Sequence, residues 1–275
     1  MMTDTDILAR IGEADVAAFG DDGAVRLRGV VDPHWIDILK TGTEKVLAAP
    51  GKYGRTQSKP DDPGFFFTEY FMCDYQPEMR RYALDGPGGT IAARLLRSER
   101  VRFFYDGLFV KEPGTERRSD WHQDQPYYPV EGRQVMVLWT PMDAAPAEVA
   151  LQVVRGSHLW GKAFTPVIFS TEQALEFDES YGEAPDVDAD PDAYDVLSWD
   201  VEPGDVIAFQ GMALHGAAGN PTGGRRRASQ TTWLGDDAVF ARRPGTLEPH
   251  FEDLDYPDGT PLTDDSAFPM VWPRA

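Results

Sequence analysis

The run VRFFYDGLFV at residues 101–110 marks the point where the chain changes character. It is rich in aromatic and β-branched residues, which favour strands. Further short runs of this kind follow, separated by Pro, Gly and Asp, at residues 135–140, 151–154, 206–209 and 228–234. Several short strands divided by turn signals are typical of an all-β sandwich or barrel. The chain after residue 100 is therefore predicted to be mainly β.

The first hundred residues are mixed and carry most of the helical signal. Apolar spacing and breaker residues predict helices over residues 4–19, 33–47 and 78–97, the last interrupted at 86–89. Asp32 followed by Pro33 is a good N-cap and first-turn pair for the second of these helices. Residues 24–31 alternate like a half-buried strand.

Length and charge limit the classes of function. The 275 residues are 41% hydrophobic, enough for one sizeable core, and we expect a single domain because β-rich folds often reach this length. Lys and Arg number 26 against 46 Asp and Glu, which gives a net charge of −20. Such a surface repels phosphate backbones and anionic lipid, so neither nucleic acid nor a membrane surface is expected as a partner.

Cysteine content and hydropathy bear on the compartment. The single cysteine, Cys73, excludes an internal disulfide framework and fits a reducing environment. No run approaches 18 apolar residues, so no transmembrane helix is expected. The N-terminus is acidic where a signal peptide would be basic. We expect a soluble cytoplasmic protein. The stretch 163–224 contains thirteen acids and no Lys or Arg, and its part from about 170 to 200 is predicted to be an acidic surface loop.

The sequence Trp121-His122-Gln123-Asp124 is the first candidate for chemistry. Residues i and i+2 of a strand share a face, so His122 and Asp124 could offer two ligands to one metal ion. A distant second histidine would complete a 2-His-1-carboxylate triad, which leaves open positions on a ferrous ion. With five histidines and so many acids, the spacing arises by chance at about even odds. His250-Phe251-Glu252 also fits, but it lies in a Pro- and Asp-rich tail with no histidine after it.

The second half of the chain supplies what the motif lacks. A turn at Glu202–Asp205 leads into the run 206–209, and His215 follows. Eleven residues later stands Arg226, the middle of three consecutive arginines. A guanidinium stays charged when buried and matches the geometry of a carboxylate. A metal triad beside a buried arginine is what a dicarboxylate cosubstrate such as 2-oxoglutarate would require, and the other two arginines are expected on a solvated turn.

Several stretches between about residue 20 and residue 235 resemble, in order and spacing, the phytanoyl-CoA dioxygenase family of iron(II)- and 2-oxoglutarate-dependent oxygenases. These are DGAVRLRGV at 22–30, KEPG at 111–114, WHQDQPYYP at 121–129, WT at 139–140, VRGSH at 154–158, and HG at 215–216 with RRA at 226–228.

The resemblance implies a mainly β fold with flanking helices and a double-stranded β-helix (jelly-roll, cupin-like) core. A single oxygenase domain, 1–275, is expected to comprise an N-terminal helical buttress (1–100), the jelly-roll core (101–240) and a C-terminal tail (241–275).

The resemblance also assigns roles to particular residues. His122, Asp124 and His215 match the iron ligands of the family, and Arg226 matches the arginine that binds the far carboxylate of 2-oxoglutarate. Arg227 is the alternative, because a slip of one residue in a strand reverses which side chain faces the site.

Further carry-overs concern the walls of the pocket. Trp139 matches an aromatic that lines the cosubstrate pocket, with core packing as the alternative. Leu108, and with it Asp106, lies on a strand whose counterparts border the cosubstrate or the substrate. A set of aromatic residues could form a wall of the substrate pocket, although core packing is expected for at least half of them: Phe104, Tyr105, Tyr127, Tyr128 and Trp160.

Two positions need separate comment. Many relatives carry a serine two residues after the second histidine, where this chain has Ala217, so a hydrogen bond to the cosubstrate is missing or comes from Ser229 or Thr231. His158 is expected to pack and hydrogen-bond at a strand end rather than to bind metal.

The activity implied is a dioxygenase that hydroxylates an unactivated C–H bond of a small molecule, consuming O2 and 2-oxoglutarate and releasing succinate and CO2. Retention of Asp124 favours hydroxylation over halogenation, because halogenating relatives replace this carboxylate with a small residue; desaturation and ring formation stay open. The alternatives are a non-catalytic metal-binding jelly-roll protein and a zinc hydrolase that uses the same His-Asp-His set. The sequence predicts neither the substrate nor the oligomeric state.

Overall fold

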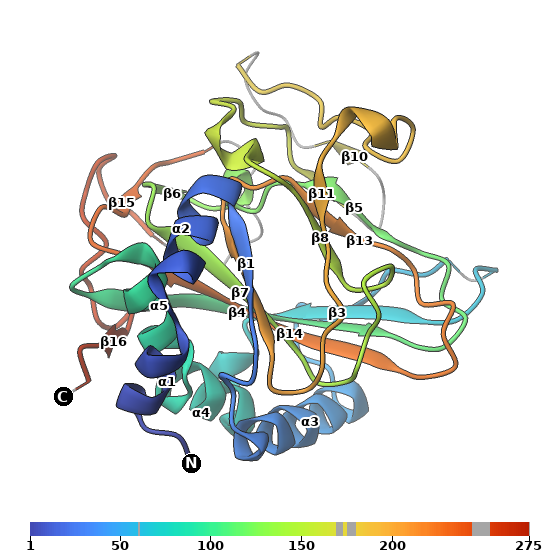
Figure 1. Ribbon diagram of the computed structural model, residues 1–275, viewed down its shortest axis with the longest axis horizontal. Coiled ribbons are helices and arrows are strands. Elements are labelled where there is room, and N and C mark those ends of the chain that lie inside the picture. The colour runs from blue at the N-terminus through green and yellow to red at the C-terminus, as the bar shows by residue number, and fades with distance from the viewer. Residues whose placement is uncertain (60, 169–172, 175–179, 244–253, 275) are drawn as a thin grey trace.

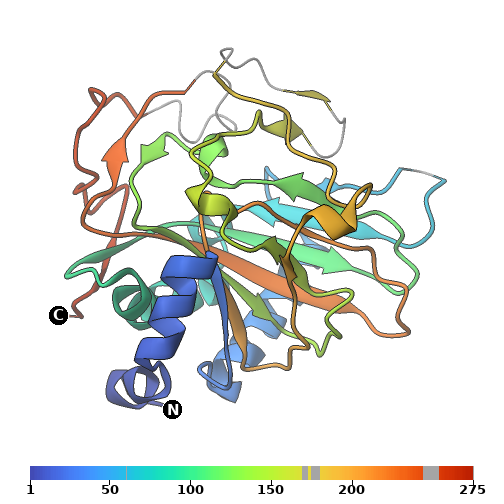
Figure 2. The ribbon, with the colours of Figure 1, turned by 45° about the horizontal axis from the view of Figure 1, so that its top comes forward.

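The computed structural model describes residues 1–59, 61–168, 173–174, 180–243 and 254–274. Within these residues, two antiparallel sheets face each other, and the helices lie along the outer side of the larger sheet (Figures 1 and 2). The prediction of a mainly β fold with flanking helices is confirmed, and the sheets do not close into a barrel.

The larger sheet has eight described strands. Its order is β1 (Ala24–Leu27), β12 (Val206–Gln210), β7 (Val135–Pro141), β14 (Arg226–Leu234), β4 (Val101–Lys111), β3 (Phe66–Tyr70) and β2 (Arg55–Thr56), with β16 (Met270–Trp272) also paired to β4.

The smaller sheet has the order β11 (Val196–Leu197), β8 (Leu151–Val154), β13 (His215–Ala217) and β5 (Ser119–His122). Two short pairings lie outside both sheets: β9 (Val167–Ile168) with β10 (Gln173–Ala174), and β6 (Val130–Glu131) with β15 (Val239–Phe240).

The helices are α1 (Asp4–Arg10), α2 (Glu13–Asp22), α3 (Pro33–Ala48), α4 (Pro77–Asp85) and α5 (Gly88–Leu96). As predicted, α3 begins after Asp32, whose side chain accepts a hydrogen bond from the His34 N–H at 3.0 Å. The single helix expected over residues 4–19 is two helices, because Gly12 caps the start of α2. The glycine cluster near residue 87 separates α4 from α5, also as predicted.

Strand alternation divides the interior into two cores. On β7, Met136 and Leu138 pack against the helices, whereas Val137 and Trp139 point toward the smaller sheet. Because successive side chains of a strand point to opposite faces, the position of a residue along its strand decides which core it enters. The space between the two sheets is the one that contains the histidines described below.

The two segments expected to be irregular contain some regular structure. The described part of the acidic stretch 170–200 is mostly exposed, but it includes β11, which extends the smaller sheet. The C-terminal segment contributes β16, which pairs with β4 at the edge of the helix-covered core. None of the described helices combines the length and apolar composition needed to cross a lipid bilayer.

Candidate metal and cosubstrate site

His122, Asp124 and His215 meet between the two sheets. His215 lies directly opposite His122 on the neighbouring strands β13 and β5, and their ring centroids are 4.2 Å apart. Oδ1 of Asp124 is 3.2 Å from Nε2 of His122 and 3.5 Å from Nε2 of His215. One ligand atom from each of the three residues lies within 4.8 Å of the others. The structure therefore brings together the three residues that the sequence singled out.

Asp124 reaches this point by a different route from the one expected. The strand β5 ends at His122, and Asp124 has helical backbone angles at the start of a 3₁₀ turn, η2 (Gln125–Tyr127). A turn, rather than strand alternation, thus directs the carboxylate toward both imidazoles.

Both imidazoles are held in the orientation that a metal ligand needs. Nδ1–H of His122 donates to the carbonyl of Asp120 at 2.7 Å, and Nδ1–H of His215 donates to the carbonyl of Ala213 at 3.0 Å. A hydrogen bond at Nδ1 fixes the tautomer and leaves the Nε2 lone pair free. In both residues Nε2 faces Asp124.

Electrostatics keeps His215 and Asp124 in the protonation states that bind a cation. Burial lowers the pKa of His215 to about 4, so its imidazole is neutral at neutral pH. Burial alone would raise the pKa of Asp124, but His215 and His122 outweigh it and hold that pKa below its usual value. Two imidazoles and one carboxylate are the donor set of a non-heme ferrous site, and these residues fit iron(II).

Gln230 is a further polar residue at the site, which the sequence analysis missed. Its Nε2 donates to Oδ2 of Asp124 at 2.9 Å and lies 3.3 Å from the hydroxyl of Tyr105. That hydroxyl is 2.6 Å from the hydroxyl of Tyr128. Alternation along β14 could have identified Gln230, since it follows Arg226 by four residues and so shares its face.

Arg226 is a buried cation that the described residues do not neutralise. It is 5% exposed, and it donates to the carbonyl oxygens of Val149 and, at 3.4 Å, of Ala218. No carboxylate of the described chain pairs with it. Burial lowers the pKa of Arg226 to about 10, which still leaves a full positive charge at neutral pH.

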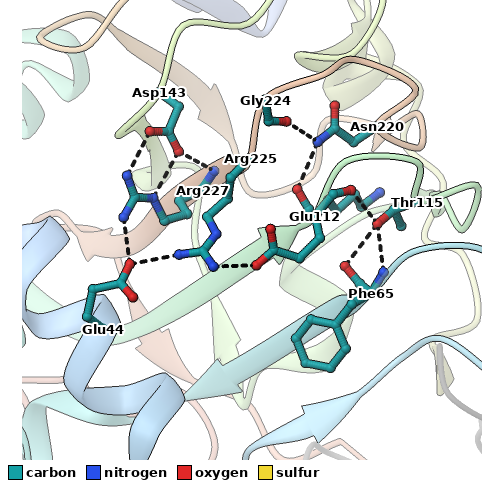
Figure 3. Close-up of polar contacts among 10 residues, drawn as sticks. Glu44, Phe65, Glu112, Thr115, Asp143, Asn220, Gly224, Arg225 and Arg227 are labelled. Carbon is teal, nitrogen blue, oxygen red and sulfur yellow. Dashed lines mark hydrogen bonds and ion pairs between the residues drawn. The ribbon is translucent and has the colours of Figure 1, made fainter.

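The two neighbouring arginines, Arg225 and Arg227, instead pair with carboxylates (Figure 3). Arg227 holds both oxygens of Asp143, with the shorter contact at 2.8 Å, and also reaches Glu44 at 2.8 Å. Arg225 pairs with Glu44 at 2.9 Å and Glu112 at 2.6 Å. Arg227, the alternative carboxylate-binding residue, is thus committed to ion pairs on the outer face of the sheet.

A pocket between the sheets connects the groups just described. It is lined by His122, His215, Arg226 and Trp139, all of which the sequence pointed to, and by Gln230 and Phe109, which it did not. Trp139 also packs in the core between the sheets, so it both lines the pocket and belongs to the core. The buried guanidinium and the two histidines of the metal-binding set therefore line one pocket, and the positive charge of Arg226 suits a carboxylate there.

Leu108 lies outside this pocket. It is fully buried in the helix-side core, and the next residue, Phe109, faces the pocket in its place. Asp106 shares the helix side with Leu108 and accepts a hydrogen bond from the Cys73 N–H at 3.2 Å. The sequence prediction was therefore displaced by one residue along β4.

The suggested substitutes for the missing serine also face the wrong way. Ser229 lies opposite Leu108 and Thr231 opposite Asp106 across β14 and β4, so both point toward the helices. Ala217 itself lines the pocket and offers no hydroxyl group. Among the described residues on β14, Gln230 is the polar side chain that accompanies Arg226 in the pocket.

The remaining candidates divide between core and surface. His158 donates from Nε2 to the Gly20 carbonyl at 3.0 Å, away from the other histidines, as expected for a packing role. The Tyr127 ring packs against His122 at 5.9 Å between centroids, whereas Trp160 is 39% exposed. Phe104, Tyr105 and Tyr128 are buried in an aromatic cluster that also includes Tyr127, and the hydroxyls of Tyr105 and Tyr128 belong to the polar network at Gln230. The pair His250 and Glu252 lies outside the described residues.

The fold is shared with several solved structures. The carbocyclase SnoK from nogalamycin biosynthesis superposes with a TM-score of 0.75 at 21% identity, covering 96% of this chain and 98% of SnoK. The epimerase SnoN in complex with Fe3+, α-ketoglutarate and nogalamycin RO gives a TM-score of 0.73 at 20% identity, covering 94% of this chain and 98% of SnoN.

EctD from S. alaskensis, in complex with 2-oxoglutarate and 5-hydroxyectoine, gives a TM-score of 0.63 at 21% identity, covering 87% of this chain and 82% of EctD. At these identities the likeness concerns the fold. No curated protein sequence matches the chain.

A family model settles the relationship. The model described as phytanoyl-CoA dioxygenase (PhyH) matches residues 19–228, which include all three candidate ligands and Arg226. The chain belongs to the phytanoyl-CoA dioxygenase (PhyH) family of iron(II)- and 2-oxoglutarate-dependent oxygenases.

Proposed function

We propose that this chain hydroxylates an unactivated C–H bond of a small-molecule substrate, using iron(II), 2-oxoglutarate and O2. The observation that carries the proposal is that His122 and His215, which group with Asp124 as a candidate metal-binding set, line the same pocket as Arg226. A structural metal site or a zinc hydrolase needs the three ligands but has no use for a buried guanidinium that lacks a carboxylate partner.

In this proposal each residue of the pocket has a separate task. Nε2 of His122 and of His215, with the carboxylate of Asp124, would hold the iron, and Gln230 would orient that carboxylate through Oδ2. Arg226 would bind the distal carboxylate of 2-oxoglutarate, because charge-assisted bonds to a guanidinium are strong in a buried site. With iron, 2-oxoglutarate and O2 bound, the site supplies an oxidant able to break a C–H bond. Trp139 and Phe109 would exclude water from it.

Hydroxylation is the outcome that the ligand set favours. Asp124 fills the position that a halide would need, so halogenation is disfavoured. SnoK and SnoN are named a carbocyclase and an epimerase. A product that retains the substrate mass or has lost two hydrogens, with no added oxygen atom, would move the proposal to epimerisation or to ring closure.

A small molecule is the partner that fits the pocket. Its walls are largely apolar, formed by side chains such as Phe109, Trp139 and Leu151, with the polar groups concentrated at the histidines, Arg226 and Gln230. Sites of this kind take small ligands with an apolar body. SnoN and EctD were crystallised with nogalamycin RO and 5-hydroxyectoine, respectively.

The experiment compares Arg226→Met with Arg227→Met in binding of 2-oxoglutarate to the iron(II)-loaded protein without oxygen. The wild type should give a weak visible charge-transfer band. R226M should bind 2-oxoglutarate about 10- to 100-fold more weakly, since hydrogen bonds to charged groups are worth about 1.5–3 kcal/mol. R227M, which loses only the pairs with Asp143 and Glu44, should bind as the wild type does. Equal affinity in R226M and the wild type would refute the role of Arg226.

A further inference from the structure

Lys111 is a second buried basic residue, and it lies beside Arg226, which lines the pocket. It is the last residue of β4, is 0% exposed, and lies directly opposite Arg226 in the register of β4 and β14. Directly opposed residues point to the same face of a sheet. Lys111 also shares its face with Phe109, which lines the pocket.

The contacts of Lys111 connect it to the pocket wall and to Arg226. Its Nζ donates to the carbonyls of Ala217 at 3.2 Å and Ala218 at 2.9 Å, and it lies 4.4 Å from the centroid of the Phe66 ring. Arg226 donates to the same Ala218 carbonyl. Lys111 and Arg226 thus both extend from the larger sheet to the chain that follows β13.

The position of Ala217 along β13 sets the distance between this pair of basic residues and the candidate metal ligands. Ala217 follows His215 by two residues of extended chain, about 7 Å. That distance suits a five-carbon diacid whose keto end lies at the histidines and whose other carboxylate lies at Arg226.

The described residues supply no carboxylate as a counter-charge for this pair. Neither Lys111 nor Arg226 forms an ion pair with a carboxylate of the described residues. Burial lowers the pKa of Lys111 well below its ordinary value, and Arg226 and Arg118 lower it further. Burial therefore disfavours the ammonium form of Lys111 beside the Arg226 guanidinium unless an anion binds there. A lysine that served only to tie two carbonyls together could be replaced by a neutral donor without this cost.

The segment around Lys111 is fixed from its other side as well. Asn220 donates from Nδ2 to the Lys111 carbonyl at 2.9 Å and to the Gly224 carbonyl at 2.8 Å (Figure 3). The loop between β13 and β14 is therefore attached to the end of β4, and the carbonyls that Lys111 contacts are held in place.

We propose that Lys111 is a positioning residue that makes the pocket selective for a dicarboxylate 2-oxo acid. It holds the Ala217 and Ala218 carbonyls against which Arg226 lies, and it adds positive potential where the distal carboxylate binds. The inference rests on the proposed function, since it assumes that Arg226 binds that carboxylate.

The test compares the binding of two 2-oxo acids to the iron(II)-loaded protein without oxygen. The first is 2-oxoglutarate, and the second is 2-oxopentanoate, which has the same chain length but no distal carboxylate. Affinities are measured by calorimetry and by the visible band. The variants are Lys111→Met, Lys111→Gln, which keeps a hydrogen-bond donor without the charge, and Lys111→Arg, which keeps the charge.

K111M and K111Q should bind 2-oxoglutarate about 10-fold more weakly while their affinity for 2-oxopentanoate changes less than about 2-fold, so selectivity falls. K111R should retain most of the selectivity. An unchanged ratio of the two affinities in K111Q, or an equal loss for both acids, would show that Lys111 has only a structural role. If the wild type itself fails to bind 2-oxoglutarate, the proposed function fails instead, and the two results cannot be confused.

Discussion

Asp106 is a buried acid that the proposed chemistry does not use. It lies on the helix-covered face of β4, accepts a hydrogen bond from the Cys73 N–H, and has one oxygen, Oδ2, without a hydrogen-bond partner. Burial raises its pKa to about 7, and Asp74 adds to the rise while Cys73 opposes it. The folded protein therefore holds a proton on Asp106 in a pH range where the unfolded chain has lost it.

This difference predicts that Asp106 makes stability depend on pH. Between about pH 4 and pH 7 the folded state binds more protons than the unfolded state, so the free energy of unfolding falls as the pH rises through this window. Asp106→Asn should remove that dependence and stabilise the protein by about 2–4 kcal/mol at pH 8. Urea unfolding at pH 5 and pH 8 measures it, with Asp37→Asn, at an exposed position of α3, as the control. A D106N variant that keeps the pH slope of the wild type would contradict the prediction.

Gln230 carries a second prediction at the scale of one residue. Its hydrogen bond to Oδ2 leaves Oδ1 of Asp124 directed at the two histidines. Gln230→Leu should lower iron(II) affinity by about 10- to 100-fold, the usual effect of removing a hydrogen bond to a ligating group. Competition with a chelator measures this, and thermal unfolding of the metal-free variant checks that the fold is kept. Wild-type iron affinity in Q230L would contradict the orienting role.

Single residues also show how far the sequence could predict the site. Most site residues lie in motifs that can be recognised from sequence spacing alone, before the strands are known: His122, Asp124, His215, Arg226 and Trp139. Gln230 has no such motif, and its place beside Asp124 depends on the pairing of β14 with its neighbours. Alternation from Arg226 gives the face of Gln230, but its contact with Asp124 cannot be predicted before the strand register is known.

At the scale of the element, β4 explains why the sequence prediction of Leu108 missed the pocket. Both faces of this strand are buried, one by the helices and one by the space between the sheets. A strand buried on both faces has apolar residues at odd and even positions alike, so the usual alternation gives no orientation. The three consecutive arginines, Arg225 just before β14 and Arg226 and Arg227 at its start, pose the same ambiguity. The pairs of Arg225 and Arg227 with Glu44 resolve it in the structure.

The assignment of faces on β4 predicts opposite effects for two neighbouring truncations. Leu108→Ala should destabilise the protein by about 2–5 kcal/mol, the cost of a cavity in a packed core, and leave 2-oxoglutarate affinity unchanged. Phe109→Ala should weaken binding of 2-oxoglutarate or of substrate in the pocket that it lines. Chemical unfolding and calorimetric titration of both variants measure the two effects. The reverse pattern, with binding lost in L108A and kept in F109A, would overturn the orientation of β4.

At the scale of the whole molecule, the longer elements were predictable and the elements that hold the ligands were not. Each of the five runs after residue 100 became a strand, and α3 and the α4–α5 break lie where the sequence indicated. The strands β5 and β13, with four and three residues, are too short to show a period. They exist because His122 and His215 pair across a long stretch of chain, which is a property of the complete fold.

The central claim is that His122, Asp124, His215 and Arg226 form a single site for iron(II) and 2-oxoglutarate. A crystal structure of the protein grown without oxygen in the presence of both tests it most directly. We expect one iron ion bound by Nε2 of each histidine and by the Asp124 carboxylate. The distal carboxylate of 2-oxoglutarate should contact the Arg226 guanidinium. Iron bound elsewhere, or 2-oxoglutarate that does not contact Arg226, would contradict it.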